Sequence, residues 1–141
     1  MAIRNFLFFF AAIAVTSVNA KDLNDFGTIK LKALSGDAPS QLRLGFHYST
    51  ANENLAEAFF WYVKAAKAGE PSACHYVAKA YATGRGTPQN LELAKVWYEK
   101  AALRGSATAM GKLGDLISVD DGNNTDDALA HAWYALAVEH G

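Results

Sequence analysis

The sequence contains a single cysteine, Cys74, in 141 residues. One cysteine cannot form an intramolecular disulfide, which excludes the small secreted domains that depend on disulfide bridges. The fold must therefore be stabilised by packing. Because Cys74 lies in an apolar pattern with helical spacing, we expect a buried, unreactive thiol, and an intermolecular disulfide is the alternative.

An excess of basic residues is also missing. The chain has 13 Lys and Arg residues against 14 Asp and Glu residues, a formal net charge of −1. No run of Lys or Arg could follow a phosphate backbone. Nucleic acid is therefore not an expected partner.

Long hydrophobic runs are absent except near the N-terminus, where residues 6–15 form an unbroken apolar stretch. Ten residues are too few for a membrane span, which needs roughly 20. Arg4 precedes this stretch, and the short residues Val18-Asn19-Ala20 follow it, as in a secretory signal peptide. The pattern predicts a signal peptide over residues 1–20, cleaved after Ala20, and a secreted or periplasmic protein without a membrane span. An uncleaved anchor is the alternative.

What the sequence does contain is a repeat. A Trp-Tyr pair occurs at residues 61–62, 97–98 and 133–134, and a glycine follows each tryptophan by eight residues. A fixed period of 36 residues predicts a solenoid of stacked helical hairpins. The predicted units are residues 36–68, 69–104 and 105–141, and residues 21–35 form a half unit that caps the N-terminal end.

Each unit begins with an apolar pattern that we call the A helix. Its positions recur at offsets of four, one and three residues, which keeps them on one helical face. They are Ser40, Leu44, Gly45 and Tyr48 in the first unit, Ala73, Val77, Ala78 and Tyr81 in the second, and Ala109, Leu113, Gly114 and Ile117 in the third. A glycine inside a helix costs about 1 kcal/mol relative to alanine. Its recurrence at Gly45 and Gly114 predicts a close approach by a neighbouring helix.

The second helix of each unit, the B helix, is expected to begin at an N-cap residue seven positions before the tryptophan. These residues are Asn54, Asn90 and Asp126. Glu57 follows Asn54 by three residues, which predicts a capping box. Each B helix should end at the recurring glycine, which adopts the left-handed conformation of a helix C-terminus.

The repeated Trp-Tyr pairs are predicted to be core residues, and a carbohydrate or cofactor site is the alternative. Their recurrence inside Ala-rich helices favours the core, where each ring removes roughly 150 to 250 Å² from water. Trp97 belongs to the central unit and is expected to be largely buried. Trp133 belongs to the last unit and should contribute less stability.

Taken together, these residues resemble the Sel-one-like repeat (SLR) family, a subclass of the tetratricopeptide-like solenoids. The resemblance covers residues 36–141 and is closest in the second unit. It is carried there by Ala73, Val77, Ala78, Tyr81, Gly84, Gly86, Ala94, Trp97, Tyr98, Lys100, Ala101, Ala102 and Gly105. Ordinary tetratricopeptide units have about 34 residues and no glycine-rich loop between their helices, so the period favours the SLR subclass. The first unit lacks both loop glycines, and the third has Leu136 in place of the lysine.

This resemblance implies an all-α fold, a right-handed superhelical solenoid of antiparallel helix pairs with about three repeats and an N-terminal capping helix. It also implies an exported, non-enzymatic adaptor or scaffold that binds another protein, in an envelope complex or outside the cell. The alternative is a cell-wall hydrolase or a protein that binds β-lactams or other ligands. That branch of the family carries paired cysteines in each repeat, and this chain has none of those pairs.

Two loops invite other hypotheses. Gly84-Arg85-Gly86 is too short for a phosphate loop and lacks the Lys followed by Ser or Thr that such a loop needs, so we interpret it as a turn. The acidic segment 120–127 suggests calcium, but the EF-hand template would place its first aspartate at Ile117. Capping of a helix explains the acidic residues without a metal.

The spacing of the histidines and of Cys74 indicates neither a metal site nor a catalytic nucleophile. The four histidines never occur four residues apart, and none has a clear ligand partner. The side chains of Cys74 and His75 diverge by about 100° around a helix. No catalytic, cofactor-binding or metal-binding residue is therefore predicted.

A protein-binding surface is predicted on the A helices, which the resemblance places on the concave side. The residues that face away from the apolar stripe fall three or four positions apart and should form a ridge. They are Arg43, Phe46, His75, Tyr76, Lys79, Lys112 and Asp115. With Phe46 and Tyr76 as exposed aromatics among cations, an acidic segment is the expected ligand, and a solvated helix face is the alternative. The end of the third unit is a second candidate surface, for a partner or for another copy of the chain.

Overall fold

The computed structural model describes residues 26–51, 53–120 and 124–141, and the predicted signal peptide lies outside them. These residues form helices joined by short turns and loops, with no strand among them. The helices are α1 (Phe26–Leu34), α2 (Ala38–Thr50), α3 (Leu55–Lys67), α4 (Pro71–Thr83), α5 (Leu91–Ala102), α6 (Ala107–Asp120) and α7 (Asn124–His140). The predicted all-α class is confirmed.

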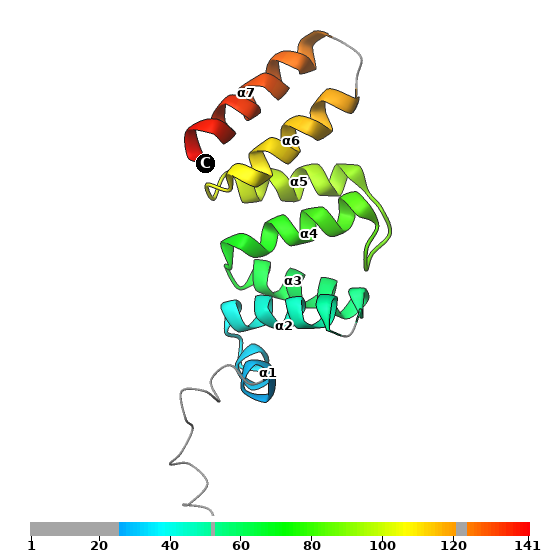
Figure 1. Ribbon diagram of the computed structural model, residues 1–141, viewed down its shortest axis with the longest axis vertical. Coiled ribbons are helices and arrows are strands. Elements are labelled where there is room, and N and C mark those ends of the chain that lie inside the picture. Colours follow the sequence, from blue (N-terminus) through cyan, green and yellow to red (C-terminus); the bar gives the residue numbers. More distant parts are fainter. Residues whose placement is uncertain (1–25, 52, 121–123) are drawn as a thin grey trace, which may run out of the picture.

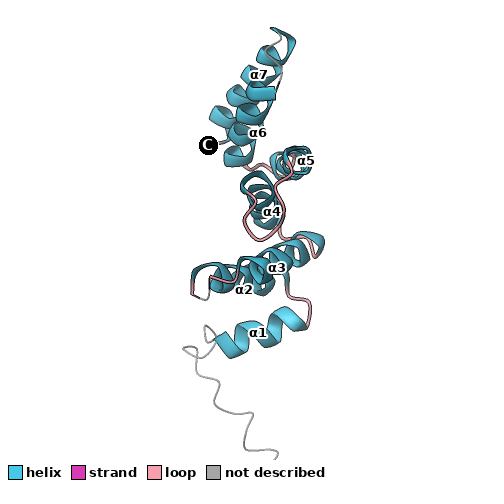
Figure 2. Ribbon diagram, turned by 90° about the vertical axis from the view of Figure 1, so that its right-hand side faces the viewer, coloured by secondary structure: helices cyan, strands magenta, loops and turns pink. Residues whose placement is uncertain are grey.

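The helices follow one another along a single long axis, from α1 at one end to α6 and α7 at the other (Figure 1). Packing contacts run chiefly between helices that are consecutive in the chain. The A helices α2, α4 and α6 form antiparallel hairpins with the B helices α3, α5 and α7, and a view turned by 90° shows the same stacking order (Figure 2). The short helix α1 packs against α2 at the N-terminal end. The architecture is a solenoid of helical hairpins.

The predicted apolar face of each A helix is the core face. Leu44, Val77 and Leu113, which are equivalent in the three repeats, are all fully buried. The glycine that follows Leu44 lies against the B helix of its own repeat, because a Cβ atom on Gly45 would meet the ring of Tyr62 at 2.6 Å. Close helix packing therefore explains the recurring glycine, as the sequence predicts.

The ends of the helices follow from local hydrogen bonds. Asn54 and Asn90 cap α3 and α5, each accepting a hydrogen bond at its side-chain oxygen from the amide three residues later. At the end of α3, Gly69 has a φ of +97°, and the amide of Glu70 donates to the carbonyl of Ala65. This is the Schellman arrangement expected of a helix-terminating glycine.

Two expectations about helix starts are wrong. Helix α7 begins at Asn124, two residues before the predicted N-cap Asp126. The capping box at α3 is only half formed. The Asn54 amide donates to the carbonyl of Tyr48, and the Glu57 carboxylate accepts a hydrogen bond from the indole of Trp61.

The repeated tryptophans are not equally buried. Trp61 is only 4% exposed and packs with Ala33 of α1 and Leu44 of α2. Trp97 of the central repeat is half-buried, so the tryptophan of the first repeat is the more fully enclosed of the two. The capping helix α1 covers Trp61. The 36-residue period alone does not predict that the equivalent tryptophans differ in burial.

Candidate protein-binding face

Phe46 of α2 and Tyr76 of α4 contact each other. Their rings meet edge to face, with centroids 4.7 Å apart. Tyr62 of α3 stacks on Tyr76 with centroids 5.3 Å apart, and both Phe46 and Tyr76 are half-buried against the core. The expectation of two freely exposed aromatics is therefore wrong. The reason is Tyr62, which reaches across the junction between the first two repeats and covers part of both rings.

These rings line a pocket of about 240 Å³ at the junction between the first and second repeats. Its walls come from α2, α3, α4 and the loop after α4. The lining residues are Phe46, Ser49, Thr50, Leu55, Ala58, Phe59, Tyr62, Tyr76, Lys79, Ala80, Thr83 and Arg85. Three of the lining residues, Phe46, Tyr76 and Lys79, belong to the predicted A-helix ridge. The other lining residues are not part of that prediction.

The loop residue Arg85 reaches this pocket because of the glycine that follows it. Gly86 has a φ of +82°, and a Cβ atom there would overlap the backbone carbonyl of Leu55 at the start of α3. Only glycine permits this close approach. The loop of the second repeat is thereby docked on the first repeat, with Arg85 beside the pocket.

Burial and a nearby positive charge have opposite effects on the pKa of Tyr62. Burial raises the pKa of the Tyr62 hydroxyl, and a hydrogen bond to Ser49 and the positive charge of Arg85 partly offset this rise. The hydroxyl of Tyr62 donates to Ser49 Oγ over 3.2 Å. Tyr62 is thus a neutral wall of the pocket, with a cation nearby.

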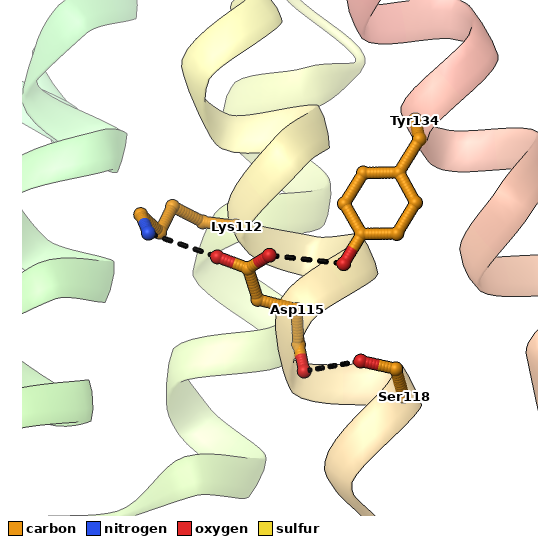
Figure 3. Close-up of polar contacts among 4 residues, drawn as sticks. All are labelled: Lys112, Asp115, Ser118 and Tyr134. Carbon is orange, nitrogen blue, oxygen red and sulfur yellow. Dashed lines mark hydrogen bonds and ion pairs between the residues drawn. The ribbon is translucent and has the colours of Figure 1, made fainter.

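Asp115 of α6 binds two side chains at the third repeat (Figure 3). Lys112 Nζ lies 2.8 Å from its Oδ2 atom, and the Tyr134 hydroxyl donates to its Oδ1 atom over 2.9 Å. The Ser118 hydroxyl donates to the backbone carbonyl of Asp115. The hydrogen bond from Lys112 lowers the pKa of Asp115 and, reciprocally, raises the pKa of Lys112. The charge of Lys112 is therefore compensated within the protein and is less available to an acidic partner than the sequence suggests.

His75 of α4 lies between Tyr76 and Tyr98, with ring centroids 5.3 Å and 5.7 Å away. Its Nδ1 atom is buried and has no hydrogen-bond partner within the described residues. Burial lowers the pKa of His75, and the charges of Lys79 and Lys112 lower it further. The half-buried imidazole therefore favours its neutral form and adds little positive charge to the predicted ridge.

Arg43 lies at the other end of the predicted ridge. It is exposed, and its charge is one of the factors that lower the pKa of Asp37, after hydrogen bonds from Ser40 and the charge of Lys32. Within residues 26–51, 53–120 and 124–141, no ion pair or ring contact joins it to Tyr76 or Lys112. Six of the seven predicted residues thus form an aromatic pocket, an ion pair and one separate cation, in place of a single continuous row. The seventh, His75, packs between Tyr76 and Tyr98.

Sequence reasoning missed Phe59, Tyr62 and Arg85 as parts of this face. Tyr62 is predicted to lie in the core and Arg85 in a turn, and no role is predicted for Phe59. One sequence signal could have found Phe59, because the equivalent position of the second repeat is Lys95. An aromatic that replaces a lysine within a repeat indicates a local role.

Metal ligation and thiol chemistry depend on the His, Cys, Asp and Glu side chains. No group of three or more of these residues among the described side chains could hold a metal ion. The side chains of residues 120–126, nearly the whole acidic segment, are not among those described. Cys74 is fully buried, as predicted, and the Arg104 guanidinium donates to its sulfur. The described helices include none with the length and apolar character that a bilayer crossing requires.

The family model of the Sel1 repeat matches residues 38–70, 71–106 and 107–141. The chain belongs to the Sel1 repeat family. The resemblance to SLR proteins drawn from the sequence is thereby confirmed, and so is the solenoid fold. Sel1 repeats form a protein-interaction fold and are generally non-catalytic scaffolds.

Solved structures of Sel1 repeat proteins agree with this assignment. The chain is 36% identical to a protective antigen present in uropathogenic Escherichia coli strains, with a TM-score of 0.74 over 89% of this chain. It spans only 26% of that protein. A Sel1 repeat protein from Oxalobacter formigenes is 34% identical, with a TM-score of 0.71 over 84% of this chain and 92% of the relative. No match was found among proteins with curated descriptions.

Proposed function

We propose that this Sel1 repeat protein is an exported, non-enzymatic adaptor that binds another protein through the concave face formed by its A helices and assembles a complex in the cell envelope or outside the cell. The observation that carries the proposal is the match of three consecutive Sel1 repeats, since this fold serves protein interaction. Two positive charges on the A helices support protein binding. Arg43 and Lys79 are exposed, and neither forms an ion pair within the described residues.

The partner is identified by crosslinking in the native cells, followed by purification and mass spectrometry. We expect one protein to co-purify in a fixed stoichiometry with the mature chain. Turnover of a β-lactam or of cell-wall material by the pure protein would contradict the adaptor and support the enzymatic alternative.

Binding through the A helices is tested by replacing Arg43, Tyr76 and Lys112 with alanine together. We expect the helical content measured by circular dichroism to be retained and the affinity for the partner to fall at least tenfold, or about 1.4 kcal/mol. An unchanged affinity would exclude this face. The exposed side of α7, at the end of the stack, would then be the better candidate.

Export is tested separately on the protein recovered from its native cells. The segment around Arg4 and residues 6–20 supports cleavage after Ala20, so the mature chain should begin at Lys21. Intact-mass measurement decides this. A chain that retains Met1, or one found only in the cytoplasm, would remove export from the proposal and leave protein binding intact.

A further inference from the structure

The pocket at the junction between the first two repeats has the size of a site for one side chain. Its volume of about 240 Å³ lies below the roughly 300 to 1,000 Å³ of small-molecule sites. It is open to solvent between three helices, and its walls include the aromatic residues Phe46, Phe59, Tyr62 and Tyr76. Aromatic faces and edges bind another ring favourably.

The repeat itself shows that stacking does not require these aromatics. Phe46, Phe59 and Tyr76 are equivalent to three lysines at the next junction. Those residues are Lys79, Lys95 and Lys112 in the same order. Tyr62 is a tyrosine in every repeat and belongs to the shared core. One junction thus stacks with three lysines where the other carries three aromatics, so the aromatic pocket is a local feature of the first junction.

Two cations adjoin the aromatic wall. Lys79 and Arg85 are both exposed pocket residues, and neither forms an ion pair in the part of the chain that the structure describes. Arg85 is held there by the contact between Gly86 and the Leu55 carbonyl. Uncompensated cations beside an apolar cavity complement a ligand that carries a carboxylate next to a bulky apolar group.

We propose that this pocket binds one aromatic side chain of the partner protein, and that an adjacent aspartate or glutamate of the partner pairs with Lys79 or Arg85. The inference rests on the proposed protein-binding function and specifies its ligand. The anchor is an aromatic ring inserted among Phe46, Phe59 and Tyr76. The carboxylate sets the orientation of the segment.

The test is a selection from a library of random displayed heptapeptides on the immobilised protein, with the Tyr76→Lys variant used for counter-selection. Lysine is the residue at the equivalent position of the third repeat, so this change is compatible with a stacked repeat. We expect enriched peptides to contain Phe, Tyr or Trp beside Asp or Glu. Enrichment of peptides without this pair, or no enrichment over the variant, would overturn the proposal.

The most enriched peptide is then synthesised and titrated against the protein and its variants. We expect at least tenfold weaker binding to Tyr76→Lys and to Lys79→Glu, and at least tenfold weaker binding when the aromatic residue of the peptide is replaced by alanine. Lys79→Glu changes an exposed side chain and keeps the test valid if Tyr76→Lys fails to fold. The matched control is Lys67→Glu, the same charge change at an exposed lysine of α3 that lies outside both the pocket and the A-helix face, and it should bind within twofold of the unmodified protein.

Two outcomes separate this inference from the proposed function. If the native partner loses affinity on combined Arg43→Ala and Lys112→Ala substitution but not on Lys79→Glu or Tyr76→Lys, the A-helix face binds the partner and the pocket inference is wrong. If N-acetylphenylalanine amide binds the pocket as tightly as the peptide does, the pocket is a small-ligand site, and the inference is also wrong.

Discussion

Trp61 shows how one residue of a repeat can differ from its equivalents. Its indole N–H donates to Glu57 Oε1 over 3.0 Å, and the Lys64 ammonium lies over its ring, 5.2 Å from the centroid. Trp97 has the corresponding contact with Lys100 at 4.3 Å but is half-buried. Burial, more than the cation contact, therefore distinguishes the two sites.

We expect Trp61→Ala to lower the free energy of unfolding by about 3 to 5 kcal/mol, since it removes a buried ring and leaves a cavity. Trp97→Ala, the matched control, should cost less because its ring is already partly solvated. Denaturant unfolding of the two variants measures the order. A larger loss at Trp97 would contradict the importance of the capping helix α1 for the first repeat.

His75 makes the stability of the folded protein depend on pH. Its pKa is lowered in the folded protein by burial and by the charges of Lys79 and Lys112, whereas the unfolded chain keeps a value of about 6.5. Below that pH the unfolded state binds the proton more readily than the folded state does. The stability is therefore fully present above about pH 6.5 and is lost as the pH falls toward the lower folded pKa.

The corresponding experiment compares the denaturant midpoint of the protein at pH 7.5 and pH 5. We expect a lower midpoint at pH 5, and a smaller decrease for His75→Gln, which keeps a polar side chain that cannot be charged. The other described histidines, His47, His131 and His140, are present in both proteins and serve as an internal control. An equal decrease in the two proteins would show that His75 is not responsible.

At the scale of the element, α6 contains two glycines in different surroundings. A Cβ atom on Gly114 would meet the ring of Tyr134 on α7 at 2.8 Å. A Cβ atom on Gly111 would meet nothing within 4 Å. The same residue type thus has a packing role at one position and none at the other, only three residues away.

We predict opposite effects of alanine at these two positions. Gly111→Ala should stabilise the protein by roughly 0.5 to 1 kcal/mol, because alanine has the higher helix propensity and open space around it. Gly114→Ala should destabilise it by about 1 to 3 kcal/mol, because the methyl group forces α6 and α7 apart. Thermal or denaturant unfolding distinguishes the two. Stabilisation by both would mean that Tyr134 moves aside at little cost.

At the scale of the whole molecule, equivalent residues experience different surroundings according to their place in the stack. Ala66 and Ala102 are 4% and 3% exposed, because the next A helix covers each of them. Val138 of α7 is their equivalent and is 82% exposed. The larger side chain is tolerated in the third repeat because no helix within the described residues packs over it.

This contrast predicts the cost of exchanging the two residue types. Ala102→Val should destabilise the protein by about 1 to 3 kcal/mol, since α6 leaves no room for two more methyl groups. Val138→Ala should change the free energy of unfolding by less than about 0.5 kcal/mol. Both are measured by denaturant unfolding at low protein concentration. A large loss for Val138→Ala would indicate that another molecule covers α7.

The sequence by itself determined the repeat, the helices and most of their ends. Its 36-residue period, the caps Asn54 and Asn90 and the left-handed Gly69 depend on spacing and on hydrogen bonds within a few residues, so local physics suffices to predict them. The prediction was wrong at Glu57, whose carboxylate accepts a hydrogen bond from the indole of Trp61 instead of capping α3, and at Asp126, because α7 begins at Asn124.

Only the tertiary structure decided which surface residues act together. Phe46, Tyr76 and Arg85 meet at one pocket because Tyr62 crosses the junction between repeats and Gly86 lies against the backbone of α3. Such a meeting depends on side-chain reach across three helices and a loop. Periodicity places equivalent residues in equivalent positions, but it does not express which neighbour covers each one. The burial of Trp61 by α1 and the exposure of Val138 at the end of the stack have the same cause.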